Sequence, residues 1–261
     1  MKLQKAEVSG SNPLEDGKKM IDPRLEIIER RLTRVKKIVA VSSGKGGVGK
    51  SVTATTIALT LKQKGYRVGL LDLDFTSPST HLILGIQDLR PVEDKGIIPP
   101  LAHGVRYMSI IYYAVDQPAP LRGADISNAI IELLAITQWG ELDYLILDMP
   151  PGIGDAMLDI IRFMRNVKLL LVSTPSIIAF ETVRKLIVLL QNLNVSIIGV
   201  LENMATNPSS CIRQKVEKLG VHYAGPINYD SELEQAFGNV ERLLKTRFAE
   251  AISLMLPLIS S

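Results

Sequence analysis

The sequence is poor in cysteine and has no long apolar run. Its 261 residues include a single cysteine, Cys211, so no internal disulfide can form and nothing indicates an oxidising compartment. No apolar stretch reaches the roughly 18–20 residues that span a bilayer. The N-terminus lacks the apolar segment of a secretory signal peptide. We therefore expect a cytoplasmic protein.

The sequence also lacks the positive charge typical of nucleic-acid-binding domains. The net charge is +3, but residues 1–37 hold 10 Lys and Arg against 6 Asp and Glu. The remaining 224 residues hold 20 against 21 and are close to neutral. Because nucleic-acid binding requires a basic face on the folded domain, we expect no nucleic acid among the partners.

Length and composition predict one folded domain. Hydrophobic residues make up 46% and charged residues 22%, as in ordinary globular proteins. A chain of this length buries a core large enough to fold without a disulfide or a metal. The polar residues 1–21 are expected to form a flexible tail, and residues 22–261 the domain.

An amphipathic helix is predicted at the start of this domain. Asp22 is a favourable N-cap, and Pro23 suits the first helical position. Apolar residues then follow at helical spacing, at Leu25, Ile28, Leu32 and Val35. We expect the helix to end near Lys36-Lys37 and to pack on the domain; a helix that faces a partner or a membrane is the alternative.

The rest of the domain alternates between short apolar runs and helical periodicity. This alternation predicts an α/β fold with a mostly parallel sheet and helices on both faces. The strands are expected at Ile38–Val41, Val68–Leu71, Tyr107–Ile111, Leu145–Leu147, Leu169–Val172 and Ile197–Leu201. The helices are expected at Ser51–Lys64, Asn128–Thr137, Ala156–Met164 and Phe180–Leu193. The irregular stretch 86–117 is expected to hold extra hairpin strands and a loop.

A glycine-rich loop follows the first predicted strand. It fits the pattern G-x-x-x-x-G-K-[ST] in full and reads Gly44-Lys45-Gly46-Gly47-Val48-Gly49-Lys50-Ser51. Glycines let backbone N–H groups close on phosphate oxygens, and the helix that begins near Lys50 directs its positive end at them. We expect the loop and the adjacent Val52 to bind ATP. Lys50 should pair with the β- and γ-phosphates as a catalytic residue, and Ser51 should ligate Mg²⁺.

Lys45 is a second lysine, near the start of this loop. With it, the loop resembles the deviant Walker A group of P-loop NTPases, which includes MinD and ParA, the nitrogenase iron protein and the Mrp/NBP35 carriers. In these families the corresponding lysine reaches the partner's phosphates across a nucleotide-sandwich homodimer. The resemblance therefore implies a homodimer and a catalytic role for Lys45.

Three aspartates follow predicted strands, at the sheet edge where open α/β proteins bind their ligands. Asp148 is expected to hold Mg²⁺ as a Walker B aspartate does. Asp72 and Asp74 lie two residues apart, so both point to one side if the chain is extended. The resemblance favours Asp74 for positioning the attacking water and Asp72 for the magnesium shell; the alternative is that one of them only caps the next turn.

Two further polar residues follow strands. Asp155 comes after Gly152-Ile153-Gly154 and is either a switch residue that responds to the γ-phosphate or the N-cap of the next helix. Asn203 carries an amide that matches the donor and acceptor edges of adenine. In the related ATPases an asparagine at this place contacts the base, so the resemblance favours ATP over GTP.

Longer strings narrow the resemblance to one branch. The chain is similar to the Mrp/NBP35 (ApbC) family over about residues 36–250. The strings that carry this similarity are residues 38–51, Arg122-Gly123, 139–144, 148–155 and 199–204. The strings Trp-Gly-Glu-Leu-Asp-Tyr and Met-Pro-Pro-Gly separate this branch from MinD and ParA. The resemblance implies an ATPase that transfers [4Fe–4S] clusters to iron–sulfur client or scaffold proteins under the control of ATP turnover.

The cluster site departs from this family pattern. Where the family carries Cys-x-x-Cys after Glu-Asn-Met, this chain has only Cys211. A [4Fe–4S] cluster ordinarily takes four thiolates, and a homodimer of this chain offers two. We expect an altered cluster site that needs other ligands, His222 being the nearest histidine in sequence. A plain loop or core role for Cys211 is the alternative.

Two other functions stay open. One is a nucleotide-gated scaffold or regulatory ATPase that holds no cluster. The other is a MinD-like ATPase that docks on a membrane, which requires a basic amphipathic end. The stretch 241–256 places Leu243, Leu244, Phe248 and Ile252 on one side, as a final helix packed on the core also would. Membrane binding is therefore the less expected of the two.

Overall fold

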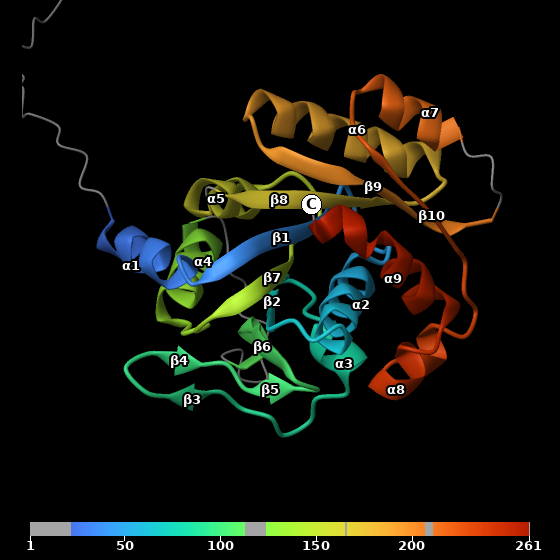
Figure 1. The fold of residues 1–261 in the computed structure, drawn as a ribbon. Coiled ribbons are helices and arrows are strands. Elements are labelled where there is room, and N and C mark those ends of the chain that lie inside the picture. The colour runs from blue at the N-terminus through green and yellow to red at the C-terminus, as the bar shows by residue number, and fades with distance from the viewer. Residues whose placement is uncertain (1–21, 113–123, 165, 207–210, 261) are drawn as a thin grey trace, which may run out of the picture.

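The computed structural model describes residues 22–112, 124–164, 166–206 and 211–260. Within these residues, helices surround an eight-stranded central sheet (Figure 1). The tail predicted at residues 1–21 and the Arg122-Gly123 string lie outside the described residues.

The central sheet is parallel except at one edge. The strand order is β10-β9-β8-β1-β7-β2-β6-β5. All neighbouring strands in this order run parallel except β5, which runs antiparallel to β6. The strands span Val35–Ser43 (β1), Val68–Asp72 (β2), Leu101–Ala102 (β5), Val105–Ser109 (β6), Leu142–Asp148 (β7), Val167–Ser173 (β8), Ser196–Ala205 (β9) and Tyr223–Asn228 (β10). The mostly parallel sheet predicted from the apolar runs is therefore confirmed.

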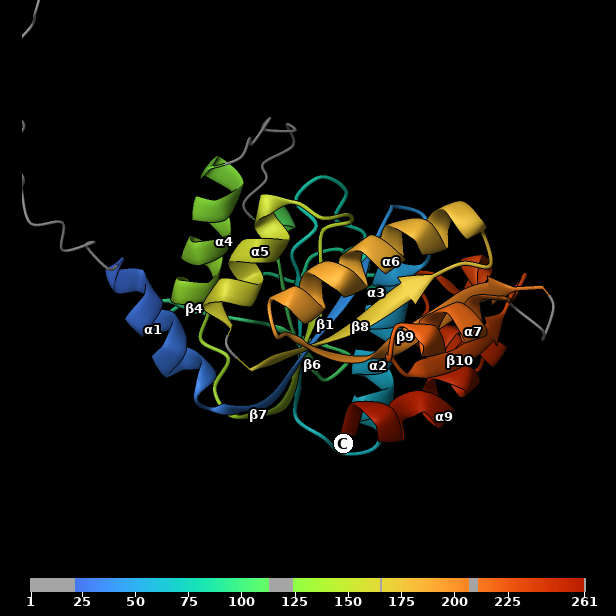
Figure 2. The same ribbon diagram turned by 90° about the horizontal axis from the view of Figure 1, so that it is seen from above.

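Helices cover both faces of this sheet, because each inner strand is apolar on both sides. In β1, Ile38 and Ala40 belong to one core, while Val39 and Val41 belong to the other. The first core is closed by α1 (Pro23–Leu32), α4 (Ala124–Ile136), α5 (Asp155–Phe163), α6 (Ile177–Asn192) and α7 (Cys211–Lys218). The second is closed by α2 (Lys50–Gln63), α3 (Thr80–Leu84), α8 (Val240–Leu243) and α9 (Arg247–Ser260). Figure 2 shows α4, α5 and α6 on one side of the strands and α2 and α9 on the other.

The N-terminal helix is shorter than its apolar spacing predicts. Asp22 caps it by accepting a hydrogen bond from the backbone N–H of Arg24, as expected. The helix ends at Leu32, however, and Val35 already pairs with Leu142 in the sheet. The prediction that the helix extends to Lys36-Lys37 is wrong, because pairing with β7 draws this segment into β1.

The irregular stretch holds the predicted hairpins. Strands β3 (Val92–Glu93) and β4 (Ile97–Ile98) form one antiparallel pair, and β5 and β6 form another. The turn between β5 and β6 places His103 and Gly104 at φ 50° and 81°, the left-handed region that tight hairpin turns require. The strand predicted at Tyr107–Ile111 ends at Ser109 and continues as a short 3₁₀ helix, Ile110–Tyr112.

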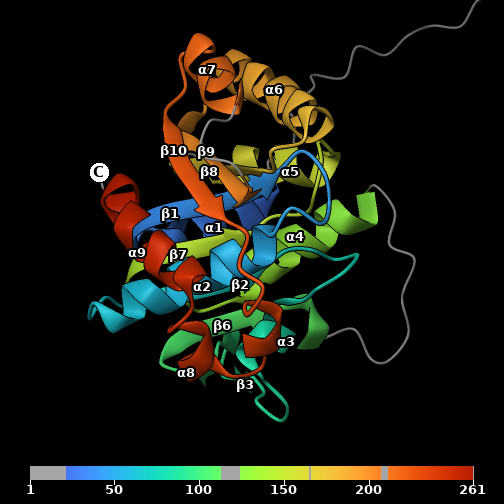
Figure 3. The ribbon, with the colours of Figure 1, turned by 90° about the vertical axis from the view of Figure 1, so that its right-hand side faces the viewer.

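The C-terminal stretch packs on the core. Residues 240–260 form α8 and α9, and α9 lies against α2 and β10 (Figure 3). Leu243, Phe248 and Ile252, which the sequence places on one apolar side, are all buried there. Among the described helices, none combines the length and apolar character needed to cross a bilayer.

Substitutions in α9 test this packing. Ile252 is fully buried, whereas Leu254, two residues further on, is 78% exposed. We expect Ile252→Ala to lower the free energy of unfolding by about 2–5 kcal/mol, because it leaves a cavity against α2. The matched variant Leu254→Ala should change it by less than about 0.5 kcal/mol. Urea denaturation of both variants checks the prediction, and equal effects would contradict it.

Candidate functional site

The glycine-rich loop lies between β1 and α2 at the carboxyl edge of the sheet, and its backbone requires glycine. Gly47 and Gly49 have φ values of 76° and 86°, in the left-handed region. A Cβ on Gly49 would also lie 2.2 Å from the side-chain nitrogen of Asn203. Lys45 is exposed at the front of the loop, and Lys50 and Ser51 open α2. The loop therefore has the close backbone turn that phosphate binding needs.

Lys50 is buried among carboxylates. Its Nζ lies 2.6 Å from Asp148 Oδ1 and 3.6 Å from Asp74 Oδ2, and it donates a hydrogen bond of 3.2 Å to Ser51 Oγ. Only 6% of Lys50 is exposed. The structure thus brings three predicted site residues together around the ammonium group of a fourth, Lys50.

Asp72 takes a different position from Asp74. It is fully buried, and its carboxylate accepts hydrogen bonds from the Thr80 hydroxyl (2.6 Å) and from the backbone N–H of Asp74 (3.0 Å). Asp74 lines the cleft described below, whereas Asp72 does not. Thus the two carboxylates do not both point into the cleft, because Asp72 is turned towards α3.

Burial changes the proton affinity of two of these carboxylates. Asp148 and Asp72 pair directly in the register of β7 and β2. Burial raises the pKa of Asp148 to about 7; the neighbouring Lys50 opposes this rise and Asp72 adds to it. Burial also raises the pKa of Asp72, and its hydrogen bonds from Thr80 oppose the rise. Additional positive charge nearby would therefore stabilise the ionised form of both carboxylates.

The donors present fit Mg²⁺ bound together with phosphate. Asp148 Oδ2 is buried and has no hydrogen-bond partner among the described residues. Nor does this part of the chain gather three or more His, Cys, Asp or Glu side chains in a ready metal site. Mg²⁺ in P-loop proteins takes a hydroxyl, phosphate oxygens, water and one or two carboxylates rather than a complete protein cage. Ser51 and the unpartnered oxygen of Asp148 match this donor set.

A cleft of about 690 Å³ opens at this edge of the sheet. Its polar part is lined by loop residues, Asp74 and Asn203, with Val52 beside them. Met204, Tyr229, Leu233 and Phe237 add an apolar part. A polar end rich in backbone donors beside a partly apolar wall suits a ligand that joins phosphates to a flat ring.

Asn203 supports the loop in this structure. It is buried, and its side-chain nitrogen donates a 2.9 Å hydrogen bond to the carbonyl of Val48. It also lines the cleft, so the predicted contact with adenine stays a prediction that this geometry allows.

The sequence reasoning missed the apolar wall. Tyr229, Leu233 and Phe237 follow β10, a strand that was not predicted because Gly225-Pro226 interrupt its apolar pattern. Proline is tolerated there because β10 is the edge strand of the sheet. Had β10 been recognised, the rule that ligands bind beyond strand ends would have pointed to Tyr229.

The segment after Asp148 approaches the loop. The backbone N–H of Gly152 donates to the carbonyl of Ser43 at 2.9 Å, so this segment contacts the end of β1. Gly154 occupies the N-cap position of α5, and Asp155 is the first helical residue. The N-cap alternative for Asp155 is therefore wrong, and its role as a switch residue stays a prediction.

Cys211 and His222 lie at opposite ends of α7. Cys211 is the first residue of this helix, after the carboxyl end of β9. The eight-residue helix spans about 12 Å. His222 follows the helix and directly precedes β10, so it lies at the amino end of that strand. His222 of the same chain is therefore badly placed to join Cys211 in one metal site.

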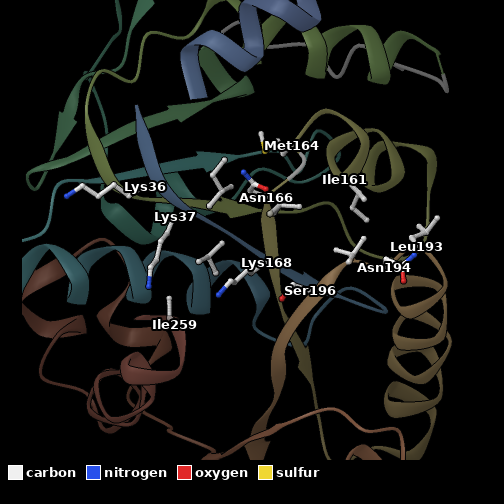
Figure 4. A pocket seen from close by; sticks show the side chains of 14 residues that line it. Lys36, Lys37, Ile161, Met164, Asn166, Lys168, Leu193, Asn194, Ser196 and Ile259 are labelled. Atoms are coloured by element: carbon white, nitrogen blue, oxygen red, sulfur yellow. The ribbon is translucent and has the colours of Figure 1, made fainter. Parts of the chain in front are cut away.

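A second hollow, of about 580 Å³, lies at the amino edge of the sheet (Figure 4). Lys36, Lys37 and Lys168 line it where β1 and β8 begin, and α5, α6 and α9 end around it. Lys37 donates a hydrogen bond to the carbonyl of Ser260 near the end of α9. Lys37 thus offsets the negative carboxyl end of α9, whereas Lys36 forms an ion pair with Asp143 (2.8 Å).

The sheet order, the phosphate loop and the carboxylates around Lys50 define a class: this is a P-loop NTPase of the deviant Walker A type. A family model described as "ParA: NUBPL iron-transfer P-loop NTPase" matches residues 34–241. The chain belongs to this family, in agreement with the resemblance found in the sequence.

Known proteins agree with this assignment. The chain is 42% identical over 180 residues to an iron–sulfur cluster carrier protein from Pseudomonas fragi. This alignment covers 67% of this chain and 63% of that protein. It thus spans less than two thirds of that relative's length. A nucleotide-binding protein from Archaeoglobus fulgidus, solved in complex with ADP, is 30% identical with a TM-score of 0.72, over 85% of this chain and 93% of that one. The cell division ATPase MinD from Pyrococcus furiosus shares the fold, at 22% identity and a TM-score of 0.64, over 86% and 98% of the two chains.

The raised pKa of Asp148 predicts a pH-dependent stability. An aspartate in the unfolded chain titrates near 3.9, whereas Asp148 in the folded protein titrates at about 7. Between these values the folded protein keeps a proton that the unfolded chain has lost, so this group lowers stability as the pH rises from about 4 to about 7. We expect the free energy of unfolding of the nucleotide-free wild type, relative to Asp148→Asn, to fall across this window. Urea denaturation at a series of pH values measures it, and a constant difference would contradict the prediction.

Proposed function

We propose that the chain binds ATP with Mg²⁺ in the cleft, hydrolyses it as a nucleotide-sandwich homodimer, and carries or assembles iron–sulfur clusters for client proteins. One observation carries the nucleotide part: the Lys50 ammonium lies at the phosphate loop, 2.6 Å from Asp148 and 3.6 Å from Asp74. A buried cation and carboxylates beside exposed loop glycines match a ligand that combines phosphates with a metal ion.

Lys50 exchanges partners when the nucleotide binds. In this structure its charge is balanced by Asp148 and Asp74. Phosphate oxygens offer the ammonium group a stronger negative partner. When Lys50 moves from Asp148 to the phosphates, the Asp148 carboxylate becomes free to bind the metal. Ser51 and Asp148 would hold Mg²⁺, which when bound neutralises charge on the phosphates. Both oxygens of Asp72 accept hydrogen bonds from Thr80 and Asp74, so Asp72 would act on the metal through its charge, from the outer part of the magnesium shell.

Hydrolysis in this scheme rests on positioning and charge. Asp74 lines the cleft and orients the attacking water. Lys50 and the loop N–H groups stabilise the negative charge on the phosphate oxygens in the transition state. Lys45 is exposed in the loop, as a residue that contacts the nucleotide of a second protomer would have to be. Asn203 and the wall of Tyr229 and Phe237 would receive the adenine.

The cluster part of the proposal rests on the family and on the relative named as an iron–sulfur cluster carrier protein. With one cysteine per chain, a homodimer supplies two thiolates through Cys211. Ligands from outside these cysteines complete the site. The single cysteine also favours a second candidate, a nucleotide-gated scaffold that holds no cluster. A membrane-positioning role is less supported, because the apolar side of α8 and α9 packs inside the domain.

Lys50→Ala tests the nucleotide part. We expect ATP turnover to fall by about 100-fold or more, because the variant loses a charged donor that stabilises the transition state. The matched variant Lys64→Ala removes an exposed lysine at the other end of α2 and should keep wild-type turnover. Phosphate release measured with saturating Mg²⁺ compares the two. Unchanged turnover in Lys50→Ala would reject the proposed site.

Anaerobic reconstitution tests the cluster part. Iron and sulfide are counted per dimer in the wild type and in Cys211→Ser, with ATP affinity as the control for folding. We expect a stoichiometric cluster in the wild type and its loss in the variant, because Cys211 is the sole thiolate of each chain. No cluster in either protein would reject the carrier role in favour of the nucleotide-gated scaffold.

A further inference from the structure

A buried chain of hydroxyl groups ends on Asp72. The Tyr107 hydroxyl lies 2.9 Å from Thr80 Oγ1, and Thr80 Oγ1 donates a 2.6 Å hydrogen bond to Asp72 Oδ2. The backbone N–H of Thr80 adds a bond of 3.3 Å to the same oxygen. All three residues are fully buried. No sequence motif marks Thr80 or Tyr107.

The direction of these hydrogen bonds follows when Asp72 is ionised, because a carboxylate can only accept. A hydroxyl group has one proton, and Thr80 donates its proton to Asp72. Thr80 Oγ1 therefore accepts the proton of the Tyr107 hydroxyl. Each hydroxyl thus orients the next, and the chain ends on the carboxylate.

The chain of bonds joins three elements. Tyr107 lies on β6, where it pairs in register with Leu70 of β2. Thr80 is the first residue of α3, and Asp72 is the last residue of β2. The loop between β2 and α3 supplies Asp74, Thr76 and Ser77 to the cleft. The hydroxyl chain therefore holds both ends of a loop that lines the site.

Asp72 acts on this loop through Asp74. Asp72 Oδ1 accepts the backbone N–H of Asp74 at 3.0 Å. The Asp74 carboxylate accepts bonds from the hydroxyl of Thr76 (2.7 Å) and the N–H of Ser77 (3.1 Å), while its other oxygen faces Lys50 at 3.6 Å. The direction of the Asp74 carboxylate thus depends on a backbone that Asp72 holds in place.

We propose that Thr80 and Tyr107 are positioning residues for nucleotide hydrolysis: they hold Asp72, and through the Asp74 backbone they direct the Asp74 carboxylate into the cleft. This inference rests on the proposed function, since it assigns Asp74 to the attacking water. Neither residue lines the cleft, so their loss affects the geometry of the reacting groups more than the binding of the nucleotide.

Hydroxyl deletions with matched controls test the inference. Thr80→Val and Tyr107→Phe each remove one link and keep the shape of the side chain. Thr60→Val removes another buried hydroxyl, bonded within α2 to the carbonyl of Thr56. Tyr112→Phe removes a buried hydroxyl that has no hydrogen-bond partner among the described residues, from a ring that packs edge-on against Tyr107. These controls separate the hydroxyl chain from the general cost of losing a buried hydroxyl.

Steady-state ATP hydrolysis and ADP affinity are measured for every variant. We expect kcat to fall about tenfold or more in Thr80→Val and several-fold in Tyr107→Phe, because small displacements of a reacting group reduce the rate strongly. KM for ATP and ADP affinity should stay within about twofold of the wild type. Thr80→Ser keeps the hydroxyl and should restore kcat, and both controls should match the wild type.

The outcomes separate this inference from the proposed function. A wild type that does not hydrolyse ATP would reject the proposed function. A wild type that does, with unchanged kcat in Thr80→Val and Tyr107→Phe, would reject the positioning role alone. Equal losses in the control variants, or a loss in Thr80→Ser as large as in Thr80→Val, would show a purely structural contribution and also reject it. If Thr80→Val does not fold, Tyr107→Phe and Thr80→Ser still decide the question.

Discussion

The site depends on one buried ammonium group. Lys50 is 6% exposed, and such a charge is costly to bury unless carboxylates balance it. Asp148 and Asp74 supply that balance from the ends of two different segments, one on β7 and one after β2. The strands must therefore lie next to each other in the sheet, and the loop must turn tightly enough to place Lys50 between them.

The sheet order provides this arrangement. Strand β1, which leads into the loop, lies beside β7, and β7 lies beside β2. The register sets Asp148 opposite both Val41 and Asp72, so two carboxylates meet at one level of the sheet edge. Their burial raises the pKa of both carboxylates, because it disfavours their charged forms. A metal ion bound beside these carboxylates would supply the positive charge that stabilises their ionised forms.

The phosphate loop is complete, whereas the proposed cluster site is not. The phosphate loop has every residue that its chemistry demands, and the structure gathers the carboxylates around it. The proposed cluster site has only Cys211, at the start of α7, and α7 separates this residue from His222. A cluster bound to a homodimer of this chain would therefore need ligands besides Cys211.

The sequence by itself determined the class of fold, the phosphate loop and the aspartates at strand ends. Apolar runs and an eight-residue motif are local patterns, readable within a few consecutive positions. Only the tertiary structure decided which groups meet: Lys50 and Asp148 are 98 positions apart, and Asn203 and Val48 are 155 apart. The same holds for the wall after β10 and for the hydroxyl chain from Tyr107, because contacts between distant segments depend on strand order and register. The N-terminal helix is also shorter than its sequence predicts, because Val35 pairs with β7 in the sheet although its spacing is helical.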